Sequence, residues 1–175
     1  DLIQAIAQSC DVYFYQLSLK LGLDRWSDYA IQCGLNKKYK IDLPDEISGM
    51  IPSRSYYEKR FGRGEWIKNL VINLGIGQGE VLTTPLGLAV FYAALVNGGT
   101  VYQPHLLKEI RSPEGRSTQN AKTVLSHLPF SNSTLEILKQ GLFEAVNSPY
   151  GTGGLARIPD IVVGGKTGTA QNPHG

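Results

Sequence analysis

The sequence predicts an α+β fold that is mostly helical and has a few short strands. Apolar residues recur at helical spacing over residues 1–33, 85–97 and 133–148. β-Branched residues gather in short runs, of which Ile161-Val162-Val163 is the clearest, and such runs are typical of buried strands. With 175 residues, 42% of them hydrophobic and 18% charged, the chain is long and apolar enough to form one domain with a core.

The composition argues against several classes of function. A net charge of +2, with no stripe of lysines and arginines, argues against nucleic-acid binding. No apolar run approaches the roughly 18 residues that cross a membrane, and no signal peptide is recognisable. Scattered histidines, and cysteines outside a CxxC pattern, predict neither a metal site nor a cofactor. Cys10 and Cys33 fall on apolar faces of expected helices, which favours two buried free thiols.

The first 33 residues predict three helices. The first two meet near Ser9-Cys10-Asp11, where polar residues interrupt the apolar pattern, and Gly22 ends the second. The third covers about 24–33 and buries Trp26, Ala30 and Cys33. Ser9 and Asp11 allow two interpretations: they cap a helix, which the local pattern by itself favours, or they serve a site.

The middle of the chain alternates between loops and one clear helix. Residues 35–63 are loop-rich, with a short helix expected at about 53–60, and the alternating glycines of residues 75–79 predict a tight turn. Thr84 and Pro85 begin a helix that ends at Asn97-Gly98-Gly99. The second face of this helix is scarcely more polar than the first, which predicts burial all round.

The region after this helix predicts short strands and a second long helix. Residues 100–102 and 106–110 are expected to form strands on either side of a turn, and 111–130 a polar, irregular surface excursion. Ser133-Thr134-Leu135-Glu136 matches a capping box for a helix that ends at Ser148-Pro149. Residues 150–154 predict a flexible link into a last strand at about 160–170.

The C-terminal stretch is the best candidate for a binding site. Glycines at 164, 165 and 168 let a ligand approach the backbone, while Lys166 supplies a positive charge. Thr167 and Thr169 are two residues apart and would share one face of a strand. This combination suits a carboxylate. A phosphate loop is disfavoured because Asp160 stands where its first glycine is needed, but a glycine-rich strand end with a solvated lysine stays open.

Three stretches taken together resemble the transpeptidase domain of penicillin-binding proteins, class B, elongation type. They are Ser9-Cys10-Asp11, Gly77-Gln78-Gly79-Glu80 leading into Thr84-Pro85-Leu86, and Lys166-Thr167-Gly168-Thr169-Ala170-Gln171. The resemblance implies a partial fold of the penicillin-binding protein and serine β-lactamase type. It implies peptidoglycan D,D-transpeptidation of stem peptides ending in D-Ala-D-Ala, through an acyl-serine intermediate that β-lactams also form. The implied parent protein is membrane-anchored at the extracytoplasmic face of the bacterial inner membrane, with cell-wall elongation partners.

The resemblance also assigns roles to single residues. Lys166, Thr167, Gly168 and Thr169 would bind the substrate carboxylate, and the backbone N–H of Thr169 would be one arm of an oxyanion hole. Ser9 would pass a proton to the departing amine. Asp11 departs from the asparagine that is common in the wider family. Because a carboxylate cannot donate a hydrogen bond to a substrate carbonyl, an orienting or electrostatic role is expected for Asp11.

The family's nucleophile motif is missing from this sequence. No serine or threonine is followed by lysine three residues later, as Ser-x-x-Lys requires. The resemblance therefore predicts that residues 1–175 are a single partial domain, without the upstream Ser-x-x-Lys region and the strands that follow Lys-Thr-Gly. Such a chain is expected to be inactive alone and to self-associate. A serine β-lactamase, or a non-catalytic domain that senses β-lactams, stays open as an alternative.

Overall fold

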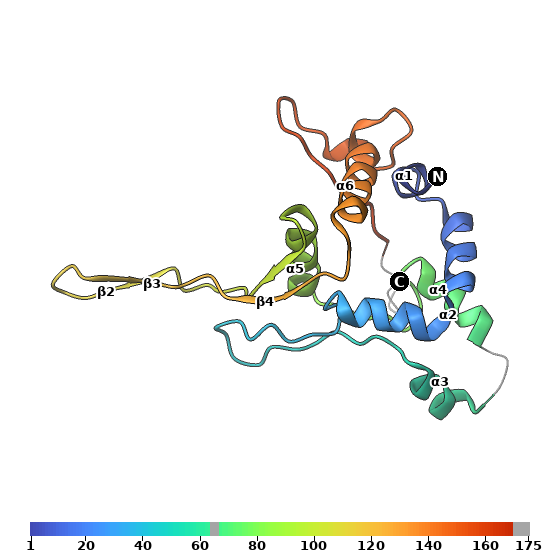
Figure 1. Ribbon diagram of the computed structural model, residues 1–175, viewed down its shortest axis with the longest axis horizontal. Helices are drawn as coiled ribbons and strands as arrows, with labels where there is room; N and C mark the ends of the chain where they lie inside the picture. The colour runs from blue at the N-terminus through green and yellow to red at the C-terminus, as the bar shows by residue number, and fades with distance from the viewer. Residues whose placement is uncertain (64–66, 170–175) are drawn as a thin grey trace.

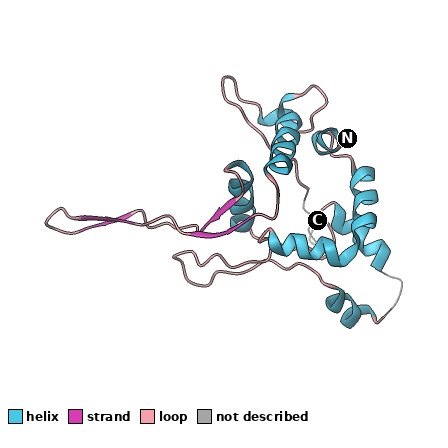
Figure 2. Ribbon diagram, in the orientation of Figure 1, coloured by secondary structure: helices cyan, strands magenta, loops and turns pink. Residues whose placement is uncertain are grey.

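The computed structural model describes residues 1–63 and 67–169, and helices dominate in this part of the chain (Figures 1 and 2). This confirms the mostly helical α+β class. The elements, in chain order, are α1 (Leu2–Ala7), α2 (Asp11–Gln32), α3 (Arg54–Phe61), α4 (Ile67–Gly75), α5 (Pro85–Val96), β1 (Thr100–Tyr102), β2 (Glu109–Arg111), β3 (Ser117–Gln119), β4 (Val124–His127), α6 (Asn132–Asn147) and a 3₁₀ turn (Gly154–Ala156).

The N-terminal helices form much as the sequence predicts. Asp1 caps α1 by accepting from the backbone N–H of Gln4 at 2.9 Å. The chain then turns at Ser9 and enters α2, which bends sharply at Gly22 because that residue has φ 72° and ψ 166°. This bend confirms the expected break between two helices. Helix α1 packs against α6, and α2 packs against α4 (Figure 1).

Two apolar clusters hold these elements together. The larger one joins α1, α5, α6 and the β1–β4 pair, and its buried members are Ile6, Cys33, Tyr39, Val90, Ala94, Leu95, Val101, Leu128, Leu135 and Leu142. The smaller one lies between α2, α3 and α4, with Leu23, Tyr57, Val71 and Leu74 buried. Each cluster therefore stabilises one side of the molecule, and loops from both sides meet at the site described below.

The strands differ from the sequence prediction in their pairing. Strand β1 pairs antiparallel with β4, and β2 pairs antiparallel with β3, so each sheet has two strands. The β2–β3 hairpin projects away from the helices as a long arm (Figure 2). Residues 111–130 are thus not irregular throughout. The three side chains of β3 are all exposed, so this strand carries no alternation of apolar and polar residues that could reveal it.

One helix is missing from the sequence prediction, and two predictions about helices are wrong. Helix α4 is absent from the sequence prediction, because the glycines that follow it dominate the local pattern. Helix α5 is not buried all round, since Leu88 and Val96 are 40% and 63% exposed. Helix α6 begins two residues earlier than the expected capping box: Ser131 is its N-cap and accepts from the backbone N–H of Thr134 at 3.2 Å.

The expected last strand is not formed among the described residues. Ile161 makes only an isolated bridge with Ile158, and Val162 is 83% exposed. The segment instead runs along α6, where Gly165 N–H donates to the Leu142 carbonyl at 3.0 Å. A strand needs a neighbouring strand to satisfy its backbone groups, and the described part of the chain offers none there. Thr167 and Thr169 nevertheless border the same cavity.

Two further expectations have clear outcomes. Both cysteines are free, and Cys33 is buried, but Cys10 is exposed at the turn between α1 and α2. The prediction of two buried thiols is therefore wrong for Cys10, because the helix pattern on which it rested ends at residue 7. None of the helices in the described ranges is both long enough and apolar enough to span a lipid bilayer.

Candidate active site

The turn between α1 and α2 presents Ser9 outside both helices. Ser9 has φ 52°, a left-handed conformation that is uncommon for residues other than glycine and is often kept at functional sites. The turn is closed by the Cys10 N–H, which donates to the Ala5 carbonyl at 2.9 Å. Cys10, not Ser9, is the N-cap of α2, and no side chain caps it. The capping interpretation of Ser9 is therefore wrong, and its hydroxyl points to other partners.

Lys166 reaches Ser9 from the opposite end of the chain. Its amine donates to Ser9 Oγ, and it also lies 3.2 Å from the Thr167 carbonyl and 3.3 Å from Thr167 Oγ1. The lysine is half-buried. A glycine-rich strand end with a solvated lysine is therefore not what the structure contains.

A third hydroxyl completes this group. Thr152 Oγ1 lies 3.2 Å from Ser9 Oγ and 3.1 Å from Thr167 Oγ1, and Ser9 Oγ lies 3.4 Å from Thr167 Oγ1. The Thr152 backbone N–H donates to the Ala7 carbonyl at 3.1 Å, which ties the 150–154 link to the end of α1. Residues 150–154 are thus an ordered connection with a polar group in the site. The only local signal is a hydroxyl residue between Gly151 and Gly153, and sequence reasoning did not identify it as a site residue.

Glycine is required beside Thr152 for a steric reason. A Cβ on Gly151 would lie 2.4 Å from the Ala145 carbonyl oxygen, so the link can approach α6 only without a side chain there. This close approach brings Thr152 over the end of α1.

These groups line a cavity of about 600 Å³. The turn after α4 forms the other wall, and Gln78 Nε2 donates to the Thr169 carbonyl at 2.6 Å across it. Every residue that the sequence nominated for the site borders this space; the lining consists of Ser9, Asp11, Ile76, Gly77, Gln78, Thr152, Lys166, Thr167, Gly168 and Thr169. Residues 170 and 171 of the third motif lie outside the described residues.

Burial and a neighbouring carboxylate shift the pKa of Lys166 in opposite directions. Burial lowers the pKa of Lys166 below its ordinary value of 10.5, because desolvation disfavours the ammonium form. The Asp11 carboxylate acts in the other direction and raises the pKa of Lys166. Asp11 lies in the first turn of α2, where a negative charge also interacts favourably with the helix dipole. Asp11 therefore helps to keep the lysine cationic.

The arrangement suits a carboxylate ligand and proton transfer between hydroxyl groups. One cation, four hydroxyls and exposed backbone at residues 167–169 converge on one cavity, and together they offer charge-assisted hydrogen bonds to an anion. Within the described ranges, no group of three or more His, Cys, Asp or Glu side chains could hold a metal ion.

Comparison with known proteins decides the family. The model of the penicillin-binding protein transpeptidase domain matches residues 1–174. The chain belongs to this transpeptidase family. Among its relatives, the peptidoglycan D,D-transpeptidase MrdA of Haemophilus influenzae is 36% identical over 175 residues, and MrdA of Escherichia coli K12 is 32% identical over 177 residues. Each alignment covers 98% of this chain but only 26% and 27% of the relative, so this transpeptidase segment spans about a quarter of their length.

Solved structures agree with this membership. The penicillin-binding protein PBP2 of Helicobacter pylori superimposes with a TM-score of 0.83 at 30% identity, over 98% of this chain and 31% of that one. The D,D-transpeptidase domain of a peptidoglycan glycosyltransferase from Eggerthella lenta gives a TM-score of 0.81 at 27% identity, over 100% of this chain and 43% of that one. The resemblance to elongation-type transpeptidases that the three motifs predicted is thereby confirmed.

Proposed function

We propose that this chain is the segment of a peptidoglycan D,D-transpeptidase that seats the stem-peptide carboxylate and supplies the proton for the leaving group. The observation that supports this most strongly is the contact between Lys166 and Ser9, two residues 157 positions apart that meet in one cavity. The relatives named above are transpeptidases, which favours this activity over that of a serine β-lactamase. Peptides ending in D-Ala-D-Ala, and β-lactams that resemble them, are the proposed ligands.

The carboxylate of the substrate binds to Lys166 and to the hydroxyls of Thr167 and Thr169. Gly168 leaves the backbone open, so that a substrate main chain can lie against it. The backbone N–H of Thr169 donates to the carbonyl oxygen that becomes negative in the transition state. These roles require Lys166 to be protonated, and the nearby Asp11 supports that state electrostatically.

Ser9 acts in proton transfer. In the acylation step the nucleophilic serine gives up its hydroxyl proton to the lysine of the Ser-x-x-Lys motif as its oxygen bonds to the carbonyl carbon, the peptide C–N bond breaks, and the departing D-Ala nitrogen takes a proton. Ser9 Oγ supplies this last proton and takes up in turn the proton that the nucleophile released, while Lys166 stays protonated and donates to the same oxygen. Thr152 and Thr167 hold the Ser9 hydroxyl in place by hydrogen bonds at 3.2 and 3.4 Å.

The nucleophile belongs to a part of the full-length protein beyond these 175 residues. No Ser-x-x-Lys occurs in the sequence, and the relatives are nearly four times longer than the matched segment. Residues 1–175 are accordingly a single partial domain that the rest of the protein completes. The full-length protein works in the bacterial cell envelope, anchored at the outer face of the inner membrane. One related structure is a complex of PBP2 with MreC, and a comparable cell-wall elongation partner is proposed for this protein.

The test uses the full-length protein with a fluorescent penicillin and with a stem pentapeptide. Wild-type protein should form a lasting 1:1 acyl adduct and release D-Ala from the peptide. Lys166→Ala should slow acylation roughly 10- to 100-fold, because a charge-assisted contact worth about 1.5–3 kcal/mol is lost. Its thermal stability should change little, since the lysine serves a ligand.

Lys37→Ala is the matched control, because Lys37 is an exposed lysine in the loop after α2. It should acylate at the wild-type rate. Rapid hydrolysis of penicillin with turnover would indicate a β-lactamase instead. Reversible binding without an adduct would indicate a sensing domain. Normal acylation of a folded Lys166→Ala protein would refute the proposal that Lys166 binds the substrate carboxylate.

A further inference from the structure

The turn that forms the far wall of the cavity is held from behind by a residue outside the site. Residues 76–80 connect α4 to the segment before α5, and both Gly77 and Gly79 have positive φ, at 74° and 78°. The Gln78 N–H donates to the Asn73 carbonyl at 3.0 Å, so the turn folds back on the end of α4. Its position decides where Gln78 meets Thr169.

Glu80 ends this turn and points away from the cavity toward α3. Its Oε2 accepts from the Tyr57 hydroxyl at 2.7 Å, and its Oε1 lies 3.4 Å from Arg60 Nη1. The Glu80 side chain is 20% exposed. Tyr57 is fully buried in the smaller apolar cluster, beside Leu23. Burial raises the pKa of Tyr57, and Glu80 raises it further, so the phenol stays protonated and able to donate. Glu80 thus fastens the turn to a residue that is itself fixed by packing.

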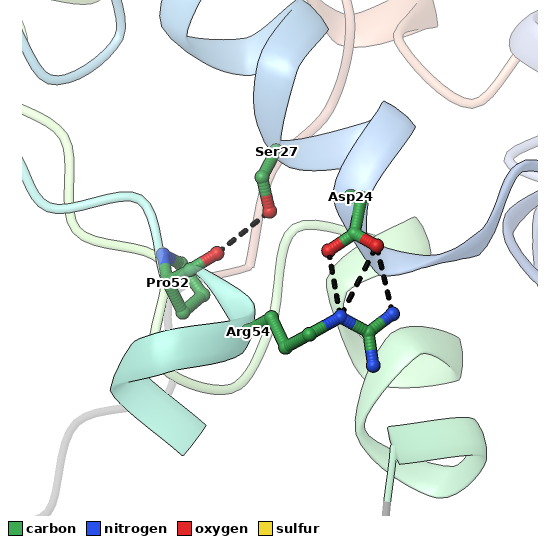
Figure 3. A network of polar contacts seen from close by, with 4 residues as sticks. All are labelled: Asp24, Ser27, Pro52 and Arg54. Carbon is green, nitrogen blue, oxygen red and sulfur yellow. Dashed lines mark hydrogen bonds and ion pairs between the residues drawn. The ribbon is translucent and has the colours of Figure 1, made fainter. Parts of the chain in front are cut away.

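Helix α3 is fixed at its other end as well. Arg54 pairs with Asp24 of α2 through three N–H···O contacts of 2.7 to 3.2 Å, and Ser27 donates to the Pro52 carbonyl at 2.7 Å (Figure 3). Because Tyr57 and Arg60 lie one and two helical turns beyond Arg54, the contacts to Glu80 come from an anchored element. The turn is therefore placed relative to α2, the helix that begins beside Ser9.

We propose that Glu80 is a positioning residue for the transpeptidase reaction: it holds the 76–80 turn so that Gln78 supports the Thr169 backbone from across the cavity. This inference rests on the proposed function and deepens it, because Thr169 contributes both to the proposed carboxylate-binding site and to the proposed oxyanion hole. Without Glu80, the turn keeps its backbone bonds to α4 but loses its side-chain attachment to α3. Gln78 then meets Thr169 less often in the geometry that the reaction needs.

The experiment compares four variants of the full-length protein: Glu80→Ala, Glu80→Gln, Tyr57→Phe and Asp24→Asn. Acylation by limiting fluorescent penicillin gives the rate constant. Glu80→Ala should slow it about 10- to 100-fold, the range expected when a reacting group is misplaced by up to about 1 Å. Glu80→Gln should stay within about threefold of wild type, because the amide oxygen still accepts from Tyr57. Tyr57→Phe should resemble Glu80→Ala.

Asp24→Asn provides the structural control, since it weakens one anchor of α3 while the Ser27–Pro52 hydrogen bond, the burial of Tyr57 and the contacts of Glu80 stay in place. Hydrogen exchange at residues 76–79 should quicken in Glu80→Ala and change much less in Asp24→Asn. The proposal is overturned if Glu80→Ala acylates at the wild-type rate, if it loses no more than Asp24→Asn at equal thermal stability, or if Glu80→Gln fails to restore the rate. Wild-type protein that does not acylate would refute the proposed function, while the exchange measurement would still decide whether Glu80 holds the turn.

Discussion

Lys166 can bind a carboxylate only while its amine carries a proton. Its pKa is lowered by burial and raised by the charge of Asp11, so these two residues together set the upper pH limit of the proposed site. This assigns Asp11 an electrostatic role, which fits a position where a carboxylate cannot donate a hydrogen bond to substrate.

A pH profile of acylation tests this role. In Asp11→Asn the negative charge is gone, so the pKa of Lys166 should fall further below 10.5, and the alkaline limb of the profile should move to lower pH. The measurement is the rate constant for acylation of the full-length protein by penicillin from neutral to alkaline pH. The alkaline limb is the part of this profile where the rate constant falls as the pH rises. Asp28→Asn removes a charge from an exposed position on the same helix and should leave the limb in place. A limb that stays put or moves upward in Asp11→Asn would contradict the assignment.

Sequence reasoning identified part of the site at the residue scale. Lys166 is predictable because it is the one cation among glycines and threonines, and Thr167 and Thr169 because they are two residues apart; all three border the cavity although no sheet forms there. Ser9 was ambiguous, because a serine between two helices usually caps one of them. Thr152 was missed, since nothing in residues 150–154 indicates that α1 and α6 bring this link beside Ser9. Only the packing of distant elements reveals it.

At the scale of elements, the contact between α1 and α6 sets the position of Ser9. Gly141 of α6 faces Ile6 of α1, and a Cβ on the glycine would lie 2.8 Å from Ile6 Cδ1 and 3.0 Å from its Cβ. The Ile6 side chain therefore fills the space over Gly141, and the two helices leave no room for a side chain there. Ser9 follows Ile6 by three residues, so any outward shift of α1 moves its hydroxyl relative to Lys166.

Gly141→Ala should therefore destabilise the protein, although alanine normally favours a helix over glycine by about 1 kcal/mol. Overpacking at such a contact costs about 1–3 kcal/mol, which outweighs the gain in propensity. Acylation by penicillin should slow as well, because Ser9 is displaced. Chemical denaturation and the acylation rate of the full-length protein give the two measurements. Adding Ile6→Val, which removes the nearest carbon, should recover part of both losses; a stabilised Gly141→Ala protein would show that the helices are not in close contact.

Element boundaries were predictable where capping chemistry is explicit. Thr84 and Pro85 define the start of α5, and the Thr84 hydroxyl accepts from the Gly87 N–H at 3.0 Å as expected. The start of α6 was misplaced because Ser131 and Ser133 both offer a hydroxyl, and sequence alone cannot say which one faces the helix N-terminus. Helix α4 was missed because its neighbouring glycines are turn signals, while its stability comes from packing against α2.

At the scale of the whole molecule, much apolar surface is exposed. A second cavity of about 600 Å³ lies between α5 and α6, with Tyr92, Val96, Phe143 and Val162 among its lining residues. Val96 and Val162 are 63% and 83% exposed. Contiguous apolar surface of this kind favours association in water.

The isolated 175-residue chain should therefore self-associate, and the exposed surface of this groove should drive the association. Light scattering across a wide concentration range measures the effect. Val96→Glu should weaken the association, because it puts a charge where apolar surface would be buried. Leu106→Glu is the matched control, since Leu106 is 64% exposed, precedes β2 and is not among the residues that line the groove. A chain that stays monomeric at every concentration would contradict the prediction.

The isolated chain should also form no covalent adduct with penicillin. Acylation needs a serine activated by a base within hydrogen-bond reach, and the proposed role of Ser9 is to pass a proton rather than to attack. In addition, only one arm of the oxyanion hole is present, and losing one donor slows acyl transfer by about 10²–10³-fold. Intact mass after incubation with fluorescent penicillin gives the answer, with the full-length protein as the positive control. A stoichiometric adduct on Ser9 would show that the Ser9–Lys166 pair is itself the nucleophilic dyad, and would reverse the assignment of roles in the site.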